Sequence, residues 1–326
     1  MNQCKITAPV CSLEQVGQVL DAGADEVYFS LMTSEWTSRF GNSDFISRRQ
    51  SEYSHITDLK DLTEIRNIVS KRKASATLVL NSRYTEKQLP YIFEVISEWE
   101  SVGGDSVMIS DLTVLLWLKE RNSRLIRHLS LLTGVFNTSS VAFFNRLDVS
   151  RIVLPRELTI SEIVEIVQHS ENNVGFELLC MFQKCEFIDS FCNFYHPFNY
   201  SPFLVNDSGE LPGKSELPVI ETFDINYKGH GCQLRFINQH GRNIKHLLNN
   251  DFCTPSCSAC QLMLFKKAGI RNFKIAGRGY PVDLIIKGIN LIKSSLGTSN
   301  NTVDEIRTRY SSIFGQSCGR DYCYYK

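Results

Sequence analysis

The chain has 326 residues, and its 35 basic and 35 acidic side chains leave it without net charge. Its 43% hydrophobic and 21% charged residues are ordinary for a globular protein. This balance excludes a global positive field that would attract nucleic acid, although a local basic patch remains compatible with it. The sequence shows neither a signal-peptide pattern nor an apolar run of membrane-spanning length, so we expect a cytoplasmic protein with reduced thiols and no membrane span.

Short apolar strands alternate with amphipathic helices along most of the chain. Strands are predicted at residues 5–10, 26–30, 76–81, 106–110, 128–132, 151–155, 175–179 and 273–276. Helices are predicted at residues 13–21, 59–69, 86–102, 112–120, 139–147, 159–167, 262–268 and 282–292. Strands that are apolar throughout indicate a parallel sheet covered on both faces. We therefore predict an α/β fold, a (β/α)8 TIM-like barrel, with a doubly wound sheet as the alternative.

Two stretches, residues 31–56 and 193–250, break this rhythm. Each follows a predicted strand, so in a barrel they would rise from the C-terminal face, where active sites lie. We predict one barrel over residues 1–294, including the insertion 193–250. Residues 295–326 would form a C-terminal helix and a cysteine-containing tail.

Nine of the 11 cysteines lie after residue 179, and eight of these fall in expected loops. In a reducing compartment, such clustering favours metal binding over disulfides. Four thiolates can hold a 4Fe–4S cluster, and zinc is the alternative. Eight thiols suit two such sites, or one site with spares. The candidate metal ligands are Cys185, Cys192, Cys232, Cys253, Cys257, Cys260, Cys318 and Cys323. We expect Cys4, Cys11 and Cys180 to be structural free thiols.

The run Cys253-x3-Cys257-x2-Cys260 has the spacing of a radical SAM cluster loop. In that superfamily the loop follows the first strand and usually carries an aromatic residue before its third cysteine. Here the motif comes late and Ala259 precedes the third cysteine. We therefore favour other chemistry.

Several polar residues follow predicted strands. Arg278, in a Gly-Arg-Gly turn, would place a guanidinium at the barrel mouth, suited to a carboxylate or phosphate. Arg156 and Glu157 end another strand, where a salt bridge between them is the structural alternative. Asn81 and Asp111 could be site groups or helix caps. His196 and His230 lie near the cysteines and could be ligands, proton donors or solvated loop residues.

Three stretches resemble the U32 family of collagenase-like peptidases. They are Ala22-Gly-Ala-Asp25-Glu-Val-Tyr-Phe29, the segment from Arg151 through Pro-Arg156-Glu157 to Ile163, and Ala268-Gly-Ile-Arg-Asn-Phe-Lys274-Ile-Ala-Gly277-Arg278. The resemblance implies a TIM-like barrel. It also implies a 4Fe–4S cluster, because members include iron–sulfur proteins of oxygen-independent hydroxylation whose ligands match Cys185, Cys192, Cys232 and Cys253.

The chain departs from the family pattern in two ways. Residues 182–184, Phe-Gln-Lys, stand where a His-Gly-Ala-Leu motif is usual. Four further cysteines, at 257, 260, 318 and 323, are additions that suggest a second cluster. The substrate is therefore not carried over from the resemblance.

The leading hypothesis is an iron–sulfur enzyme for oxygen-independent hydroxylation or related redox chemistry. Arg278, with Arg156 and Glu157, would act on an anionic small molecule, peptide or RNA. One alternative is a metal-stabilised peptidase. The other is a non-catalytic iron–sulfur subunit that works with a homologous or electron-transfer partner.

Overall fold

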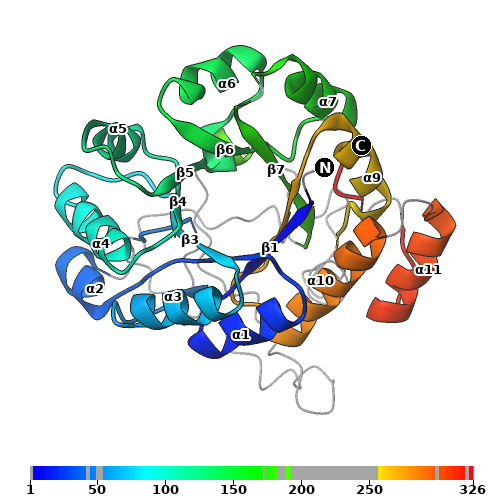
Figure 1. Ribbon diagram of the computed structural model, residues 1–326, viewed down its shortest axis with the longest axis horizontal. Coiled ribbons are helices and arrows are strands. Elements are labelled where there is room, and N and C mark those ends of the chain that lie inside the picture. The colour runs from blue at the N-terminus through cyan, green and yellow to red at the C-terminus, as the bar shows by residue number, and fades with distance from the viewer. Residues whose placement is uncertain are drawn as a thin grey trace, which may run out of the picture.

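The computed structural model describes residues 3–41, 45–48, 54–171, 173–182, 188–191, 256–297, 301–319 and 323–325. Eight parallel strands close into a barrel in chain order, which confirms the predicted fold class (Figure 1). The strands are β1 Lys5–Pro9, β2 Glu26–Phe29, β3 Ser75–Leu80, β4 Ser106–Ile109, β5 Ile126–Leu129, β6 Val149–Val153, β7 Gly175–Met181 and β8 Asn272–Ile275.

Helices form a ring around the barrel, and α11 lies outside α10 (Figure 1). The α-helices are α1 Leu13–Asp21, α2 Ser34–Phe40, α3 Asp61–Lys71, α4 Leu89–Ser101, α5 Leu112–Glu120, α6 Thr138–Asn145, α7 Ile160–His169, α9 Leu262–Ala268, α10 Val282–Gly297 and α11 Val303–Phe314. Short 3-10 turns are η2 Leu131–Thr133, η3 Asp189–Phe191 and η6 Ala259–Gln261. Within the described ranges, no helix is long and apolar enough to cross a bilayer.

Closure of the sheet depends on the pairing of the first and last strands. Thr7 of β1 is in register with Glu26 of β2 on one side and with Lys274 of β8 on the other. Because adjacent residues in a strand point to opposite faces, alternate residues face the barrel interior and the helices. The interior of each strand can therefore be followed residue by residue.

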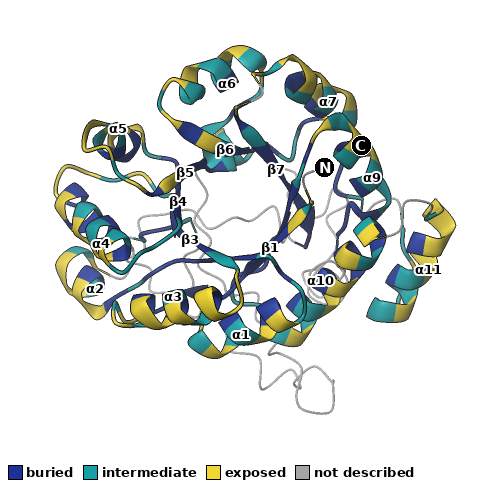
Figure 2. Ribbon diagram, viewed as in Figure 1, coloured by how far each residue is buried: buried dark blue, intermediate teal, exposed yellow. Residues whose placement is uncertain are grey.

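The outward-facing strand residues and the inner faces of the helices form the main hydrophobic core. In Figure 2 the helices are buried toward the barrel and exposed outward. In α1, for example, Val16, Val19 and Leu20 are buried, at the three- and four-residue spacing that predicted this helix. The predicted capping box of α7 is confirmed, since Thr159 and Glu162 bond each other's backbone N–H groups.

The stretch 31–56 contains structure that the sequence did not reveal. Helix α2 begins after Thr33, whose hydroxyl accepts from the backbone N–H of Trp36, and Trp36 is fully buried. The chain then returns beside β2, where Leu31 and Ile56 form a parallel bridge. The second predicted insertion, 193–250, lies outside the described residues.

Candidate functional site

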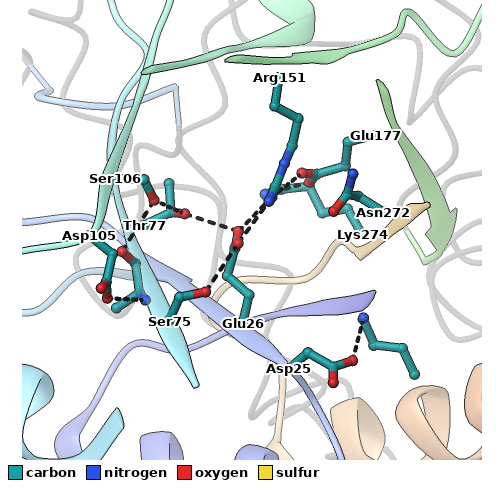
Figure 3. A network of polar contacts seen from close by, with 12 residues as sticks. Asp25, Glu26, Ser75, Thr77, Asp105, Ser106, Arg151, Glu177, Asn272 and Lys274 are labelled. Atoms are coloured by element: carbon teal, nitrogen blue, oxygen red, sulfur yellow. Dashed lines mark hydrogen bonds and ion pairs between the residues drawn. The ribbon is translucent and has the colours of Figure 1, made fainter. Parts of the chain in front are cut away.

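The barrel interior is built in three layers, of which the lowest is a charged cluster at the N-terminal end of the strands (Figure 3). Arg151 of β6 donates through Nη1 to both carboxylate oxygens of Glu26, at 2.9 and 3.0 Å, and to Oε2 of Glu177, at 2.9 Å. The Nζ atom of Lys274 lies 3.2 Å from the other oxygen of Glu177. Since β2 and β6 are not neighbours in the barrel, the contact between Arg151 and Glu26 crosses the interior.

This base cluster balances its own charge. Burial raises the pKa of Glu177, but Lys274 and Arg151 outweigh burial, so the pKa of this carboxyl lies below its usual value. Burial, followed by the charge of Arg151, holds the pKa of His128 well below its usual value, which favours the neutral imidazole. Two carboxylates then face two cations, with Thr77 donating to Glu26 at 3.0 Å. The charges of this cluster are therefore balanced within it, which leaves no net charge for a ligand.

An apolar layer covers the base cluster. Tyr28, Val79, Met108 and Val153 pack together as a cluster separate from the main core. The ring of Tyr28 lies over Lys274, with 3.6 Å between the ammonium nitrogen and the ring centroid, and its hydroxyl donates to the carbonyl of Ile275 at 2.9 Å. This layer separates the base cluster from the barrel mouth.

The third layer is a ring of small polar side chains at the mouth, which we call the mouth ring: Ser30, Asn81, Ser110 and Ser130. Each is the first residue after its strand, and each continues the inward-facing alternation. The amide of Asn81 donates to Ser130 at 3.3 Å, which joins the ends of β3 and β5 across β4. The hydroxyls of Ser30 and Ser110 are buried and have no hydrogen-bond partner in the described part of the chain. Unsatisfied buried hydroxyls are groups that a ligand can satisfy.

Arg278 stands at the same end, above the apolar layer. Its flanking residues, Gly277 and Gly279, have φ angles of 111° and 87°, a backbone region that favours glycine. The Arg278 guanidinium donates to the hydroxyl of Ser47 at 3.1 Å and lies 6.0 Å from the ring centroid of Tyr28. The predicted Gly-Arg-Gly turn therefore brings a buried guanidinium to the barrel mouth.

Arg156 and Glu157 also lie at this rim, but Arg156 pairs with Asp189 of η3 rather than with Glu157. The Nε atom of Arg156 donates to Asp189 at 2.7 Å, and a second contact makes the pair bidentate. Glu157 accepts from the backbone N–H of Asp189 at 3.0 Å. Burial and the nearby Asp189 raise the pKa of Glu157. These residues fix the segment that follows β7, so their first role is structural. Asp111 is likewise the N-cap of α5.

The sequence model of peptidase family U32 matches residues 11–322. The chain belongs to this family. The collagenase of Porphyromonas gingivalis is 22% identical over 316 residues, which are 94% of this chain and 68% of the collagenase. The tRNA hydroxylation protein P of Helicobacter pylori is 26% identical over 168 residues. That alignment covers 51% of this chain and 36% of the relative, so the chain spans only about a third of that protein's length.

A second protein of that name, from Haemophilus influenzae, is 24% identical over 50% of this chain and 33% of its own length. Among solved structures, a U32 peptidase is 12% identical, with a TM-score of 0.42 over 55% of this chain and 70% of the other. At that TM-score the likeness carries no functional information.

The four cysteines expected to hold a cluster, Cys185, Cys192, Cys232 and Cys253, lie outside the described residues, as do His196 and His230. Cys180 is a buried free thiol on β7, as predicted, and Cys4 and Cys11 are half-buried free thiols. That the first four cysteines bind a cluster stays a prediction, and so does the purely structural role of Cys4, Cys11 and Cys180.

The four additional cysteines of this U32 chain are described, and they gather in one place. The Cys257 thiol hydrogen-bonds Cys318, and Cys260 lies within electrostatic range of Cys318 and Cys323. The hydrogen bond from Cys257 lowers the pKa of Cys318 to about 6, while that bond and burial raise the pKa of Cys257. The sequence grouped these four thiols, and the structure pairs Cys257 with Cys323 by a backbone bridge. Their role as metal ligands stays a prediction.

Sequence reasoning missed most of the mouth ring. Only Asn81 was singled out, because single serines after strands look like ordinary loop residues. Their positions in the sequence could have revealed them. Each of Ser30, Ser110 and Ser130 lies two residues after an inward-facing strand residue, so its side chain also faces the barrel interior. The sequence also did not reveal that Arg151 is a buried, paired ion, because its partners Glu26 and Glu177 lie on other strands, β2 and β7.

Proposed function

We propose that this U32 chain is an enzyme whose reaction does not use molecular oxygen. It would hydroxylate an anionic or RNA-like substrate, or modify it by related redox chemistry. The observation that carries the proposal is the mouth ring beside Arg278. Buried, unsatisfied hydroxyls suit the polar edge of a base or small organic acid, and a buried guanidinium suits its phosphate or carboxylate. The two relatives named tRNA hydroxylation protein P support RNA as the substrate class.

The reaction needs an oxygen source and an electron acceptor. Water supplies the oxygen atom, and replacing C–H by C–OH releases two electrons and two protons. We propose an electron-transfer protein partner as the acceptor. A 4Fe–4S cluster supplies one-electron transfer when it is bound. Cys185, Cys192, Cys232 and Cys253 would hold it, because the U32 resemblance implies these four thiols as its ligands.

The chain's own residues position the substrate. Arg278 would bind its anionic group, and Ser30 and Ser110 would exchange hydrogen bonds with its polar edge. The apolar layer, to which Tyr28 belongs, would keep the reacting carbon away from the base cluster and its charges. Arg156 would act indirectly, by holding Asp189 at the rim.

The test compares RNA from cells that lack the gene with RNA from cells that carry it, by mass spectrometry of nucleosides. We expect a nucleoside that is one oxygen atom lighter in the deletion, restored by the wild type and by Arg121→Gln. Arg121 is the control because it follows α5, at the opposite end of the barrel from the mouth. Cys185→Ser and Arg278→Gln should fail to restore it. Unchanged RNA, with no iron or sulfide in anaerobically purified protein, would overturn the proposal.

The collagenase relative, which aligns with 94% of this chain, supports a second candidate, a peptidase. In the described part of the chain, Nδ1 of the buried His128 has no hydrogen-bond partner, so no carboxylate orients this imidazole through Nδ1 as in a catalytic triad. Incubating the protein with gelatin before and after iron chelation separates the two candidates. Cleavage that survives chelation and is lost on Glu157→Gln substitution would favour the peptidase.

A further inference from the structure

A short segment beside the end of β7 contacts the C-terminal tail, by which we mean the described residues 315–319 and 323–325. The backbone N–H of Phe182 donates to the carbonyl of Ser256 at 2.7 Å, and that of Ser258 donates to Cys180 at 2.9 Å. On the other side of the segment, the N–H of Tyr324 donates to the carbonyl of Cys257 at 3.0 Å. The end of β7, residues 256–258 and residues 323–325 therefore lie side by side, in a ladder that extends beyond the barrel.

This ladder brings two cysteine pairs together. Cys257 and Cys260 lie on the middle segment and the η6 turn, while Cys318 and Cys323 lie on the tail beyond α11. Cys257 and Cys323 are direct bridge partners, and the Cys257 thiol hydrogen-bonds Cys318. All four are free thiols, and none of them is fully exposed.

The spacing and the surroundings favour a metal over a disulfide or an inert thiol cluster. C-x2-C followed by C-x4-C supplies two ligand pairs on separate segments, as in four-thiolate zinc sites. Across the described residues, no three His, Cys, Asp or Glu side chains lie close enough together to hold a metal ion. A metal would therefore draw together thiols that are already neighbours.

We propose that Cys257, Cys260, Cys318 and Cys323 form a structural four-thiolate site for a zinc-class divalent cation, which fastens the C-terminal tail to the end of β7. The η6 turn that carries Cys260 packs against α10 and α11, outside the barrel interior (Figure 1). The site is thus separate from the mouth ring, and its role is to hold the chain together. This proposal is independent of the proposed function.

The tail that the cation would fasten reaches the rim of the candidate site. The Tyr325 hydroxyl donates to the carbonyl of Leu179 in β7 at 2.9 Å, and its ring is fully buried against Phe265. The neighbouring Tyr324 hydrogen-bonds the side chain of Arg156, the residue that holds Asp189. A cation at the four cysteines would therefore also stabilise the rim.

The experiment measures zinc and iron per chain in full-length protein purified anaerobically, in the wild type and three variants. We expect one zinc per wild-type chain. That zinc should be retained in Cys185→Ser/Cys192→Ser and in the control Cys4→Ser, and lost in Cys318→Ser. Iron should be lost in Cys185→Ser/Cys192→Ser and retained in Cys318→Ser and in the control Cys4→Ser. Failure of this proposal can therefore be told from failure of the proposed function. Because Cys318 is only partly buried, its serine variant should still fold, which circular dichroism checks.

A second measurement does not depend on any variant. Chelation of the wild type should release the zinc and expose the tail to a protease that cuts after aromatic residues, and added zinc should restore protection. Zinc retained by Cys318→Ser would overturn the proposal. So would iron at these four cysteines, seen as about eight rather than about four atoms per chain. A Cys257–Cys318 disulfide in the anaerobic protein would also overturn it.

Discussion

The two ends of the barrel interior are both polar, but the base carries charged groups in ion pairs and the mouth carries uncharged hydroxyls. At the base, Glu26, Arg151 and Glu177 meet one another across the barrel at 2.9–3.0 Å. At the mouth, the buried hydroxyls of Ser30 and Ser110 have no hydrogen-bond partner among the described residues. A buried polar group is costly unless it is paired. The ion pairs of the base therefore indicate stability. Oγ1 of Thr7 and Nδ1 of His128 at the base also have no described hydrogen-bond partner, but the two serine hydroxyls lie at the barrel mouth, where a ligand can reach them.

The largest expected effect comes from breaking the base. Arg151→Met should lower the free energy of unfolding by about 3–5 kcal/mol, because it leaves two buried carboxylates with a single cation. Urea unfolding followed by circular dichroism measures this. Arg39→Met is the matched control, since Arg39 pairs with Glu35 on the exposed face of α2 and should cost less than about 1 kcal/mol. Equal losses in the two variants would contradict the role of the base cluster.

Two serines on one strand sharpen the comparison. Ser106 of β4 contacts the Thr77 hydroxyl at 2.7 Å, whereas Ser110, four residues on, has no described partner. Ser106→Ala should cost about 1 kcal/mol of stability and leave substrate affinity unchanged. Ser110→Ala should leave stability within about 0.5 kcal/mol and weaken substrate affinity by roughly fivefold. Thermal unfolding and binding titrations test both variants, and the reverse assignment would refute the distinction between base and mouth.

The smallest effect is the acid sensitivity of the base. The pKa of His128 is well below its usual 6.5, so the unfolded chain takes up a proton before the folded chain does. Stability should therefore fall as the pH drops below about 6.5, before the carboxylates titrate. Charged groups around His128 are Lys5, Arg151, Glu177 and Lys274. His128→Gln should flatten this slope in urea midpoints measured from pH 7 to 5.

The exposed His169 on α7 provides the control for that measurement, because His169→Gln should leave the slope as in the wild type. If His128→Gln and the wild type lose stability in parallel, other groups cause the acid sensitivity.

The barrel was predictable because its strands are short and apolar and its helices carry regular apolar faces. The base cluster was not, because Arg151 resembles a surface residue until β2 and β7 place Glu26 and Glu177 opposite it. At the candidate site, Arg278 was predictable from its two glycines, which mark an unusual turn at a strand end. The partner of Arg156 was not, since Asp189 lies 33 residues away along the chain. Pairing of the tail with residues 256–258 depends on backbone contacts that no local pattern encodes.

The base cluster also bears on the order of folding. Lys274 arrives with β8, the last strand, which closes the barrel against β1. A chain with only the first seven strands would hold two carboxylates and one cation at its base, and this excess charge would keep its interior hydrated. Lys274 should thus neutralise the base in the same late step in which β8 closes the barrel. Partly formed barrels would then not become trapped with a dehydrated interior and the wrong strand register. Refolding of Lys274→Met, compared with the wild type by stopped-flow fluorescence, measures that coupling as a slower final phase.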